Sequence, residues 1–176
     1  MSMLFLKIVA SLMIISSCTL IGYFLGMTYS KRVENLILLQ NCIRILETEI
    51  VYSATPLPEA FNNVYLKGNK KVSYVFNDIK KYLIQNKDAT VFDVFVSVSK
   101  TLSDELHLKK EDIEIILSLG RVIGNSDRLD QQKHFKMIHT QLENQCKEAE
   151  ESKKKNEKLY KNLGVMSGLA ITIILF

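Results

Sequence analysis

Two long hydrophobic runs lie at the ends of the chain, and almost all of its charged side chains lie between them. Residues 1–30 contain a single charged residue, Lys7, and residues 162–176 contain none. Because a charged side chain at the centre of a membrane helix costs about 2.5–3.5 kcal/mol, these ends suit lipid and the middle suits water. The pattern predicts an N-terminal transmembrane segment (1–30), a soluble domain with a long C-terminal helix (31–161) and a C-terminal transmembrane segment (162–176).

The two hydrophobic runs differ in length. Residues 8–29 are uncharged, and as a helix they would extend about 33 Å, enough to cross a hydrocarbon core of about 30 Å. Residues 163–176 would extend only about 21 Å, which is short for a span unless the Lys161 side chain reaches out to the interface. We expect a second span here, with a re-entrant or interfacial tail as the alternative.

In the middle region, apolar residues recur every three or four positions, which is typical of amphipathic helices. The first helix is expected over 33–52, with a buried seam formed by Leu36, Leu39, Ile43, Leu46 and Ile50. Further helices are expected at about 58–66, 72–85 and 90–102, from 109 or 110 onward, and over 127–160. Thr90 and Asp93 fit a capping box at the start of the 90–102 helix, and residues 125–127 (NSD) are a cap signal for the last helix. The seam of that last helix includes Leu129, Phe135, Ile138 and Leu142. A strand is an alternative for 90–102, because that segment is rich in β-branched residues. The predicted fold class is all-α, with six helices between the terminal spans.

Three pairs of glycines are four residues apart: Gly22 and Gly26, Gly120 and Gly124, and Gly164 and Gly168. Small residues at this spacing let two membrane helices approach closely, so the first and last pairs predict that the spans pack on each other or on partner spans. Glycine is also simply commoner in membrane helices, which is the alternative explanation. The middle pair indicates a close helix contact or a helix end in the soluble domain.

Basic residues beside the hydrophobic runs predict the orientation. Those on the domain side include Lys31, Arg32, Lys153, Lys154 and Lys155, whereas the other side has Lys7. Since positive charge is retained in the cytoplasm, the domain is expected in the cytosol and both termini outside. The lysine triplet is also positioned to attract anionic lipid.

An alternative comes from the motif Ile15-Ser16-Ser17-Cys18, which fits the cleavage site of a bacterial lipoprotein. In that case Cys18 would be lipidated and the domain exported. The hydrophobic run continues well past Cys18, however, and the basic residues would have to cross the membrane, so this alternative is not favoured.

No constellation of residues points to catalysis or to a cofactor. His134 and His139 are five residues apart and lack an acidic metal-binding frame, and the three cysteines are far apart in the sequence. No Gly-rich phosphate loop or GxSxG motif occurs. A net charge of +4 is too small to imply nucleic acid. We therefore expect no catalytic residue, metal or cofactor, and no enzymatic activity.

The order of these features resembles the stage III sporulation protein AB family of endospore formers. The most specific stretches are residues 46–52 (LETEIVY), 55–61 (TPLPEAF), Leu119-Gly120 with Gly124, Asp127-Arg128 with 131–134 (QQKH), and Asn162-Leu163-Gly164. The resemblance covers nearly the whole chain in order.

That family is in turn similar to the cytoplasmic domains of the inner-membrane platform proteins of type II secretion and type IV pilus systems, which are six-helix bundles. The resemblance implies a non-enzymatic platform of a secretion-like channel between mother cell and forespore. It also implies a mother-cell membrane location facing the forespore. The implied partners are a cytosolic secretion-type ATPase (stage III sporulation protein AA) and the other membrane components of the complex.

The resemblance and the charge pattern together suggest where the ATPase would dock. We hypothesise an exposed acidic surface near the double-proline turn, formed by Glu47, Glu49, Thr55, Pro56, Pro58 and Glu59. A different class of function is a membrane-tethered coiled-coil scaffold, which predicts self-association through the seam of 127–160.

Overall fold

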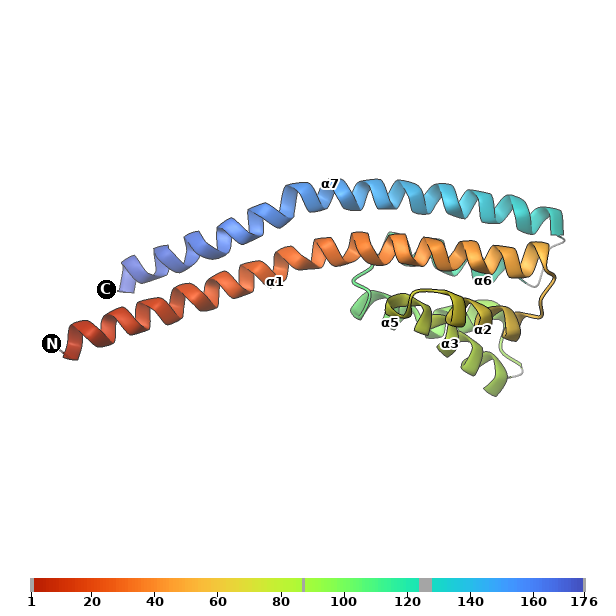
Figure 1. Ribbon diagram of the computed structural model, residues 1–176, viewed down its shortest axis with the longest axis horizontal. Helices are drawn as coiled ribbons and strands as arrows, with labels where there is room; N and C mark the ends of the chain where they lie inside the picture. Colours follow the sequence, from red (N-terminus) through yellow and green to blue (C-terminus); the bar gives the residue numbers. More distant parts are fainter. Residues whose placement is uncertain (1, 87, 124–127, 176) are drawn as a thin grey trace. The chain divides into compact units, whose positions relative to one another are not determined.

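The computed structural model describes residues 2–86, 88–123 and 128–175, and every regular element in these ranges is helical (Figure 1). The elements are α1 (Ser2–Glu47), the π-helix η1 (Thr48–Tyr52), α2 (Leu57–Lys67), α3 (Lys70–Gln85), α4 (Val91–Ser97), α5 (Ser99–Asp104), α6 (Lys110–Val122) and α7 (Arg128–Leu175). The predicted all-α fold is confirmed. Gly124 and the predicted cap at 125–127 lie outside the described residues.

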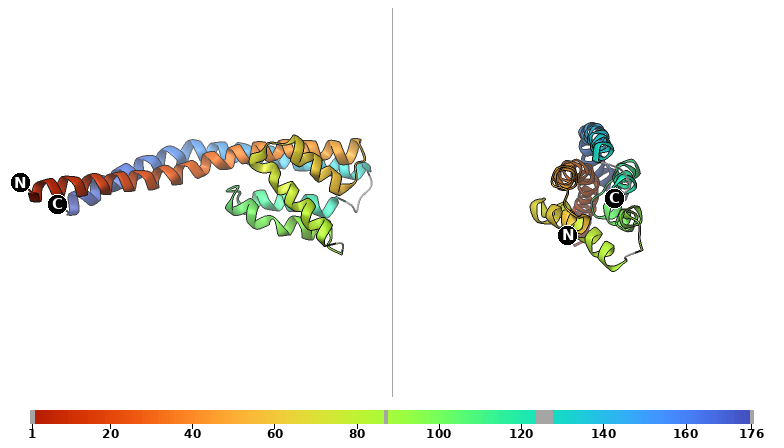
Figure 2. Two further views of the ribbon diagram at one scale, coloured as in Figure 1. Left: turned by 60° about the horizontal axis from the view of Figure 1, so that its bottom comes forward. Right: turned by 90° about the vertical axis from the view of Figure 1, so that its right-hand side faces the viewer.

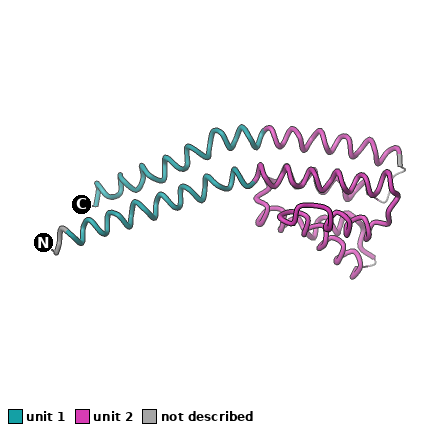
Figure 3. The backbone as a smooth tube through the Cα atoms, in the orientation of Figure 1, with its two compact units in different colours: residues 1–31, 148–176 teal, residues 32–147 magenta. Residues whose placement is uncertain are grey.

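The chain divides into two compact units (Figure 3). Unit 1 consists of residues 1–31 and 148–176, and unit 2 of residues 32–147. Helices α1 and α7 are continuous and contribute to both units. By length and composition, both helices contain a stretch that is apolar enough to cross a membrane.

In unit 1, α1 and α7 pack through glycines. A Cβ atom on Gly22 would lie 2.6 Å from the carbonyl oxygen of Tyr160 and 2.8 Å from the Cα of Gly164. A Cβ on Gly168 would lie 3.0 Å from the Cα of Ile15, and one on Gly26 3.0 Å from the carbonyl oxygen of Glu157. The two helix backbones therefore touch where Gly22 meets Gly164, which only glycine permits, and they approach closely at Gly26 and Gly168.

Beside this stripe, unit 1 holds a small set of polar and aromatic contacts. The Glu157 carboxylate accepts hydrogen bonds from Ser30 Oγ at 2.9 Å and from Lys161 Nζ at 2.7 Å. These two donors lower the pKa of Glu157, Lys161 having the larger effect. The rings of Tyr29 and Tyr160 stack with centroids 5.8 Å apart. These contacts fix the register of α1 against α7 within unit 1.

In unit 2, α2 packs on α3 and α4 packs on α6, as the grouped short helices in Figure 2 show. The buried core contains the predicted seam residues Leu36, Leu39, Ile43 and Leu46, together with Phe61, Phe76, Phe95, Phe135, Ile138 and Leu142. A Cβ on Gly120 would lie 3.0 Å from the Cα of Phe92, so this glycine allows α6 to approach α4 closely.

The segment predicted as one helix over 90–102 is helical but divided in two. Thr90 and Asp93 form the predicted capping box at the start of α4. α4 ends at Ser97 and α5 begins at Ser99. Val98 lies between them with φ and ψ of −95° and 0°, and its side chain is buried.

Candidate partner-docking surface

An open groove runs along unit 2 between the second half of α1 and the first part of α7. Both walls are helical, and η1 closes one end of the groove with Tyr52. We call this surface the α1–α7 groove. It is lined by Gln40, Arg44, Glu47, Tyr52, Leu129, Gln132, Lys133, Lys136, His139, Thr140 and Glu143.

The groove combines charged walls with two exposed apolar side chains. Glu47 Oε2 lies 2.9 Å from His139 Nε2, which links the two walls across the groove floor. Gln132 Nε2 donates to the Tyr52 hydroxyl at 3.3 Å. Tyr52 is 58% exposed and Leu129 69% exposed, although Leu129 was predicted to belong to the α7 seam. Large apolar side chains that are so exposed beside polar walls are typical of protein-binding surfaces.

Glu49 does not belong to this surface, and its predicted exposure is wrong. Its side chain is buried, and the carboxylate accepts hydrogen bonds from Lys67 Nζ at 2.6 Å, and from Asn63 Nδ2 and Thr55 Oγ1 at 2.9 Å each. These donors, Lys67 first, lower the pKa of Glu49 to about 2. The Glu49 carboxylate therefore stabilises the packing of α2 and of the turn at Thr55 against the end of α1 and η1.

The π-helix η1 explains why Glu49 turns inward. A π turn contains one more residue than an α turn, so the positions after it rotate out of the α-helical pattern. Glu49 and Val51 become buried within η1, whereas the predicted seam residue Ile50 is only partly buried. Sequence periodicity alone assumes a constant 3.6 residues per turn, and it therefore missed this change.

The remaining predicted docking residues lie in or beside the turn that follows η1. The Thr55 backbone N–H donates to the Glu49 carbonyl at 2.9 Å, so Thr55 is tied to Glu49 by both its backbone and its side chain. Pro56 precedes α2, Pro58 lies in its first turn, and Glu59 is exposed there. Of the six predicted residues, Glu47 lines the groove, and Pro56 and Glu59 are accessible beside the turn. Pro58 is partly buried, and Glu49 and Thr55 stabilise the fold.

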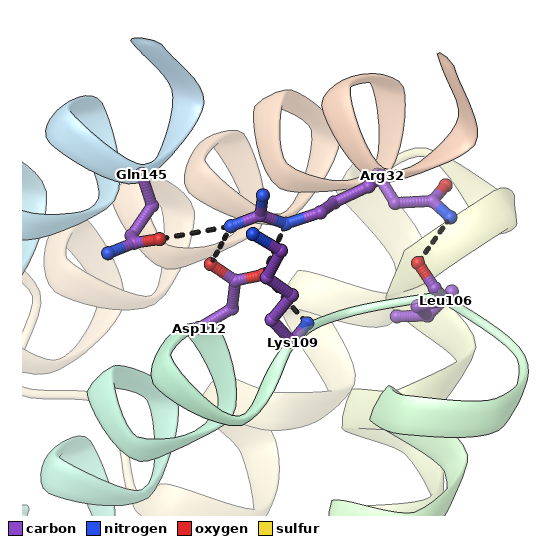
Figure 4. Close-up of polar contacts among 6 residues, drawn as sticks. Arg32, Leu106, Lys109, Asp112 and Gln145 are labelled. Carbon is purple, nitrogen blue, oxygen red and sulfur yellow. Dashed lines mark hydrogen bonds and ion pairs between the residues drawn. The ribbon is translucent and has the colours of Figure 1, made fainter. Parts of the chain in front are cut away.

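Arg32 also differs from its prediction as a membrane-proximal basic residue. Its side chain is buried, and it donates to the buried carboxylate of Asp112 from Nε at 2.8 Å and from Nη2 at 2.9 Å (Figure 4). Nη2 also donates to Gln145 Oε1 at 3.0 Å. The charge of Arg32 is therefore used to join α1, α6 and α7 inside unit 2, whereas Lys31, Lys154 and Lys155 are exposed and Lys153 is partly exposed.

The partner of Arg32 is not evident from the sequence. Asp112 lies in the first turn of α6, where an acidic residue is favoured by the helix dipole and is usually solvated. Its carboxylate does accept the Lys109 backbone N–H at 2.9 Å, which is a normal cap contact. Nearby, Asn35 Nδ2 donates to the Leu106 carbonyl at 2.9 Å. Only the three-dimensional structure reveals that the same carboxylate also accepts the guanidinium.

Within the described ranges, no group of three or more His, Cys, Asp or Glu side chains could hold a metal ion. Cys18 and Cys146 are partly buried, and Cys42 is fully buried. Burial raises the pKa of the Cys42 thiol to about 11, which keeps it protonated and unreactive.

Comparison with known proteins gives one consistent result. Residues 7–176 match the family described as stage III sporulation protein AB. The chain is 32% identical over 170 residues to the stage III sporulation protein AB of Bacillus subtilis (strain 168), across 97% of this chain and 99% of that relative. A solved structure of a stage III sporulation protein AB is similar with a TM-score of 0.63 and 31% identity, across 70% of this chain and 97% of that chain. The resemblance identified from the sequence is confirmed, and the chain belongs to the stage III sporulation protein AB family.

Proposed function

We propose that this sporulation protein is a non-enzymatic membrane platform of a secretion-like channel complex, and that unit 2 docks a cytosolic secretion-type ATPase. The ATPase would be stage III sporulation protein AA. In this proposal α1 and α7 anchor the chain in the mother-cell membrane facing the forespore, with unit 2 in the cytosol. The apolar stretches of the two long helices support the anchoring, and the α1–α7 groove on unit 2 supports docking.

The observation that carries the docking proposal is the α1–α7 groove. Interfaces between proteins depend on a few large side chains at the centre of a polar rim. Tyr52 and Leu129 are large side chains of this kind, because both are exposed and both line the groove beside charged neighbours. Glu47 and Glu143 contribute negative charge to the lining, and Lys133 and Lys136 contribute positive charge, so a partner of mixed charge fits best.

A platform that transmits force must resist deformation where its partner binds. Both walls of the groove belong to long uninterrupted helices, α1 and α7. The buried Arg32–Asp112 pair and its contact with Gln145 hold these two helices and α6 together inside unit 2. A conformational change of a docked ATPase would therefore move the helices as a set rather than bend one of them.

The proposal is tested by binding of the purified ATPase to the full chain in membrane vesicles. We expect the double variant Tyr52→Ala, Leu129→Ser to weaken binding by roughly tenfold or more, as loss of two large interface side chains does. A matched control is Leu66→Ser, Ile84→Ser, which removes two similarly exposed apolar side chains from α2 and α3. Equal binding by the groove variant and the unmodified chain would refute docking in the groove.

The coiled-coil scaffold is less well supported. It requires the seam of residues 127–160 to be free for a second copy. Phe135, Ile138, Leu142 and Ala149 are instead almost completely buried within the chain itself. Self-association through this seam would have to displace those contacts.

The exported lipoprotein is also less well supported. Cleavage before Cys18 would remove Ile15, whose Cα is close to Gly168 in the packed pair of helices. The variant Cys18→Ser separates the two possibilities: a lipoprotein would lose its anchor, whereas a chain held by spans would remain in the membrane fraction.

A further inference from the structure

Four exposed lysines of unit 1 lie beside its apolar stretches: Lys31, Lys154, Lys155 and Lys158. We propose that these residues, here named the basic collar, bind the headgroups of anionic lipids. The inference rests on the membrane insertion proposed above and is independent of ATPase docking.

Lys31 and Lys155 point away from the contact between the two helices. Lys31 follows Gly22 by nine residues on α1, and Lys155 precedes Gly164 by nine residues on α7. At about 3.6 residues per turn, nine residues correspond to about two and a half turns. Since Gly22 and Gly164 face each other, Lys31 and Lys155 lie on opposite outer sides of the helix pair.

The same spacing puts the two lysines at one level. Helices α1 and α7 run antiparallel past the Gly22–Gly164 contact, and nine residues extend about 13–14 Å along each helix. The hydrogen bond between Ser30 and Glu157 confirms that this part of α1 lies beside this part of α7. Cations on opposite sides at one level cannot converge on a small anion, but they match the lipid that surrounds a pair of spans.

The position of these lysines along the helix axes corresponds to the lipid headgroup region. The uncharged run of α1 ends at Ser30, directly before Lys31, and the run of α7 begins at residue 162. Lys158 is therefore about 6 Å from the start of the α7 run, and Lys154 about 12 Å. The headgroup region is about 5–8 Å deep, and the potential of an anionic surface extends about 8–10 Å further. All four ammonium groups fall within its reach.

These charges are available to a ligand. Lys31, Lys154, Lys155 and Lys158 take part in no hydrogen bond or ion pair within the described residues. The acidic residue at their level, Glu157, is already bound by Lys161 and Ser30. Glu150 and Glu151 are farther from the apolar run than Lys154, by four and three residues. Arg32 is excluded from the collar because Asp112 neutralises it inside unit 2.

The test measures lipid preference of the full chain in vesicles of phosphatidylcholine with phosphatidylglycerol. Spin-labelled phosphatidylglycerol and spin-labelled phosphatidylcholine report which lipid occupies the protein surface. We expect the phosphatidylglycerol label to associate about threefold to tenfold more strongly at low salt, and the preference to shrink at high salt. The triple variant Lys154→Gln, Lys155→Gln, Lys158→Gln should bring the ratio close to one.

A control with the same change in net charge is Lys81→Gln, Lys100→Gln, Lys110→Gln, whose exposed lysines lie on α3, α5 and α6 of unit 2. It should keep the preference. Equal association of both labels with the unmodified chain would overturn the proposal, as would a preference that survives in the collar variant. Flotation of the chain with the vesicles after alkaline washing tests membrane insertion separately from lipid preference. ATPase binding by the collar variant tests docking separately, and it should be unchanged.

Discussion

Arg32 and Asp112 are eighty residues apart in the sequence, yet the guanidinium donates to both oxygens of the carboxylate, at 2.8 and 2.9 Å, in the interior of unit 2. A bidentate contact of this kind fixes both the distance and the relative orientation of the guanidinium and the carboxylate. Lys31, the preceding residue, is exposed. Two neighbouring basic residues that look equivalent in the sequence therefore have different tasks.

Removal of one member of this pair should be far more damaging than replacement of both. Arg32→Met leaves a buried carboxylate without its cation, and we expect it to lower the free energy of unfolding by about 3–5 kcal/mol. The double variant Arg32→Met, Asp112→Leu removes both charges and should lose much less than the sum of the two single variants. Denaturant unfolding of the full chain in detergent, followed by circular dichroism, measures all three.

A double variant as unstable as Arg32→Met alone would show that the buried charges themselves matter little. In that case the loss would come from altered packing or from the Lys109 backbone N–H, which also donates to Asp112.

Ionisation of Glu49 should make the free energy of unfolding depend on pH. Its pKa is lowered from 4.5 to about 2, so its ionised form stabilises the fold fully above pH 4.5, and this contribution is lost as the pH falls towards 2. We expect Glu49→Gln to cost about 1–3 kcal/mol at pH 7, because the hydrogen bonds to a charged acceptor are lost. The difference from the unmodified chain should shrink between pH 4.5 and pH 2.

Urea unfolding of both proteins at pH 7, 4 and 3 measures this change. Glu114→Gln is the matched control, since Glu114 is exposed on α6 and should show no such dependence. A cost for Glu49→Gln that is the same at pH 7 and pH 3 would contradict the assigned role of the carboxylate.

The glycine contact in unit 1 should not tolerate even a methyl group. In Gly22→Ala the new Cβ would meet two backbone atoms of α7, the Tyr160 oxygen and the Gly164 Cα, which cannot rotate away. We expect the helices to separate and their close cross-linking to fall several-fold. Ser17→Ala, at an exposed position on α1, should have little effect.

The contact between Ser30 and Glu157 provides the readout. Ser30 Oγ lies 2.9 Å from Glu157 Oε2, so a short thiol cross-linker should join the two helices in the variant Ser30→Cys, Glu157→Cys. The variant Ser30→Cys, Lys155→Cys, whose second cysteine takes an exposed position, should be linked far less. Mass spectrometry of the linked peptides measures the yield in membranes with and without Gly22→Ala. An undiminished yield would mean that the backbone contact is not required.

The sequence predicted the elements of this fold well, because its signals are local. The α1 seam from Leu36 to Leu46 and the capping box of Thr90 and Asp93 are patterns within a few residues of each other. The uninterrupted α7 follows from the absence of glycine or proline between residues 128 and 163. Such features require no knowledge of what the helix packs against.

The candidate site was harder to predict, because its residues are defined by distant partners. Nothing near Glu49 in the sequence indicates that Lys67 and Asn63 will fold back on it. Nothing near Arg32 points to Asp112. Leu129 continues the apolar pattern of α7 but is exposed at the mouth of the groove. In each case tertiary contacts, which the local pattern does not contain, decide whether the side chain is buried or exposed.

The π turn also constrains how the length of residues 48–52 can change among homologous proteins. A chain one residue shorter between Thr48 and Tyr52 would relax to an ordinary α turn. Ile50 would then rejoin the apolar stripe, and Glu49 would rotate away from its three donors. Among homologues, we therefore expect deletions in this turn to coincide with loss of the acidic residue at position 49.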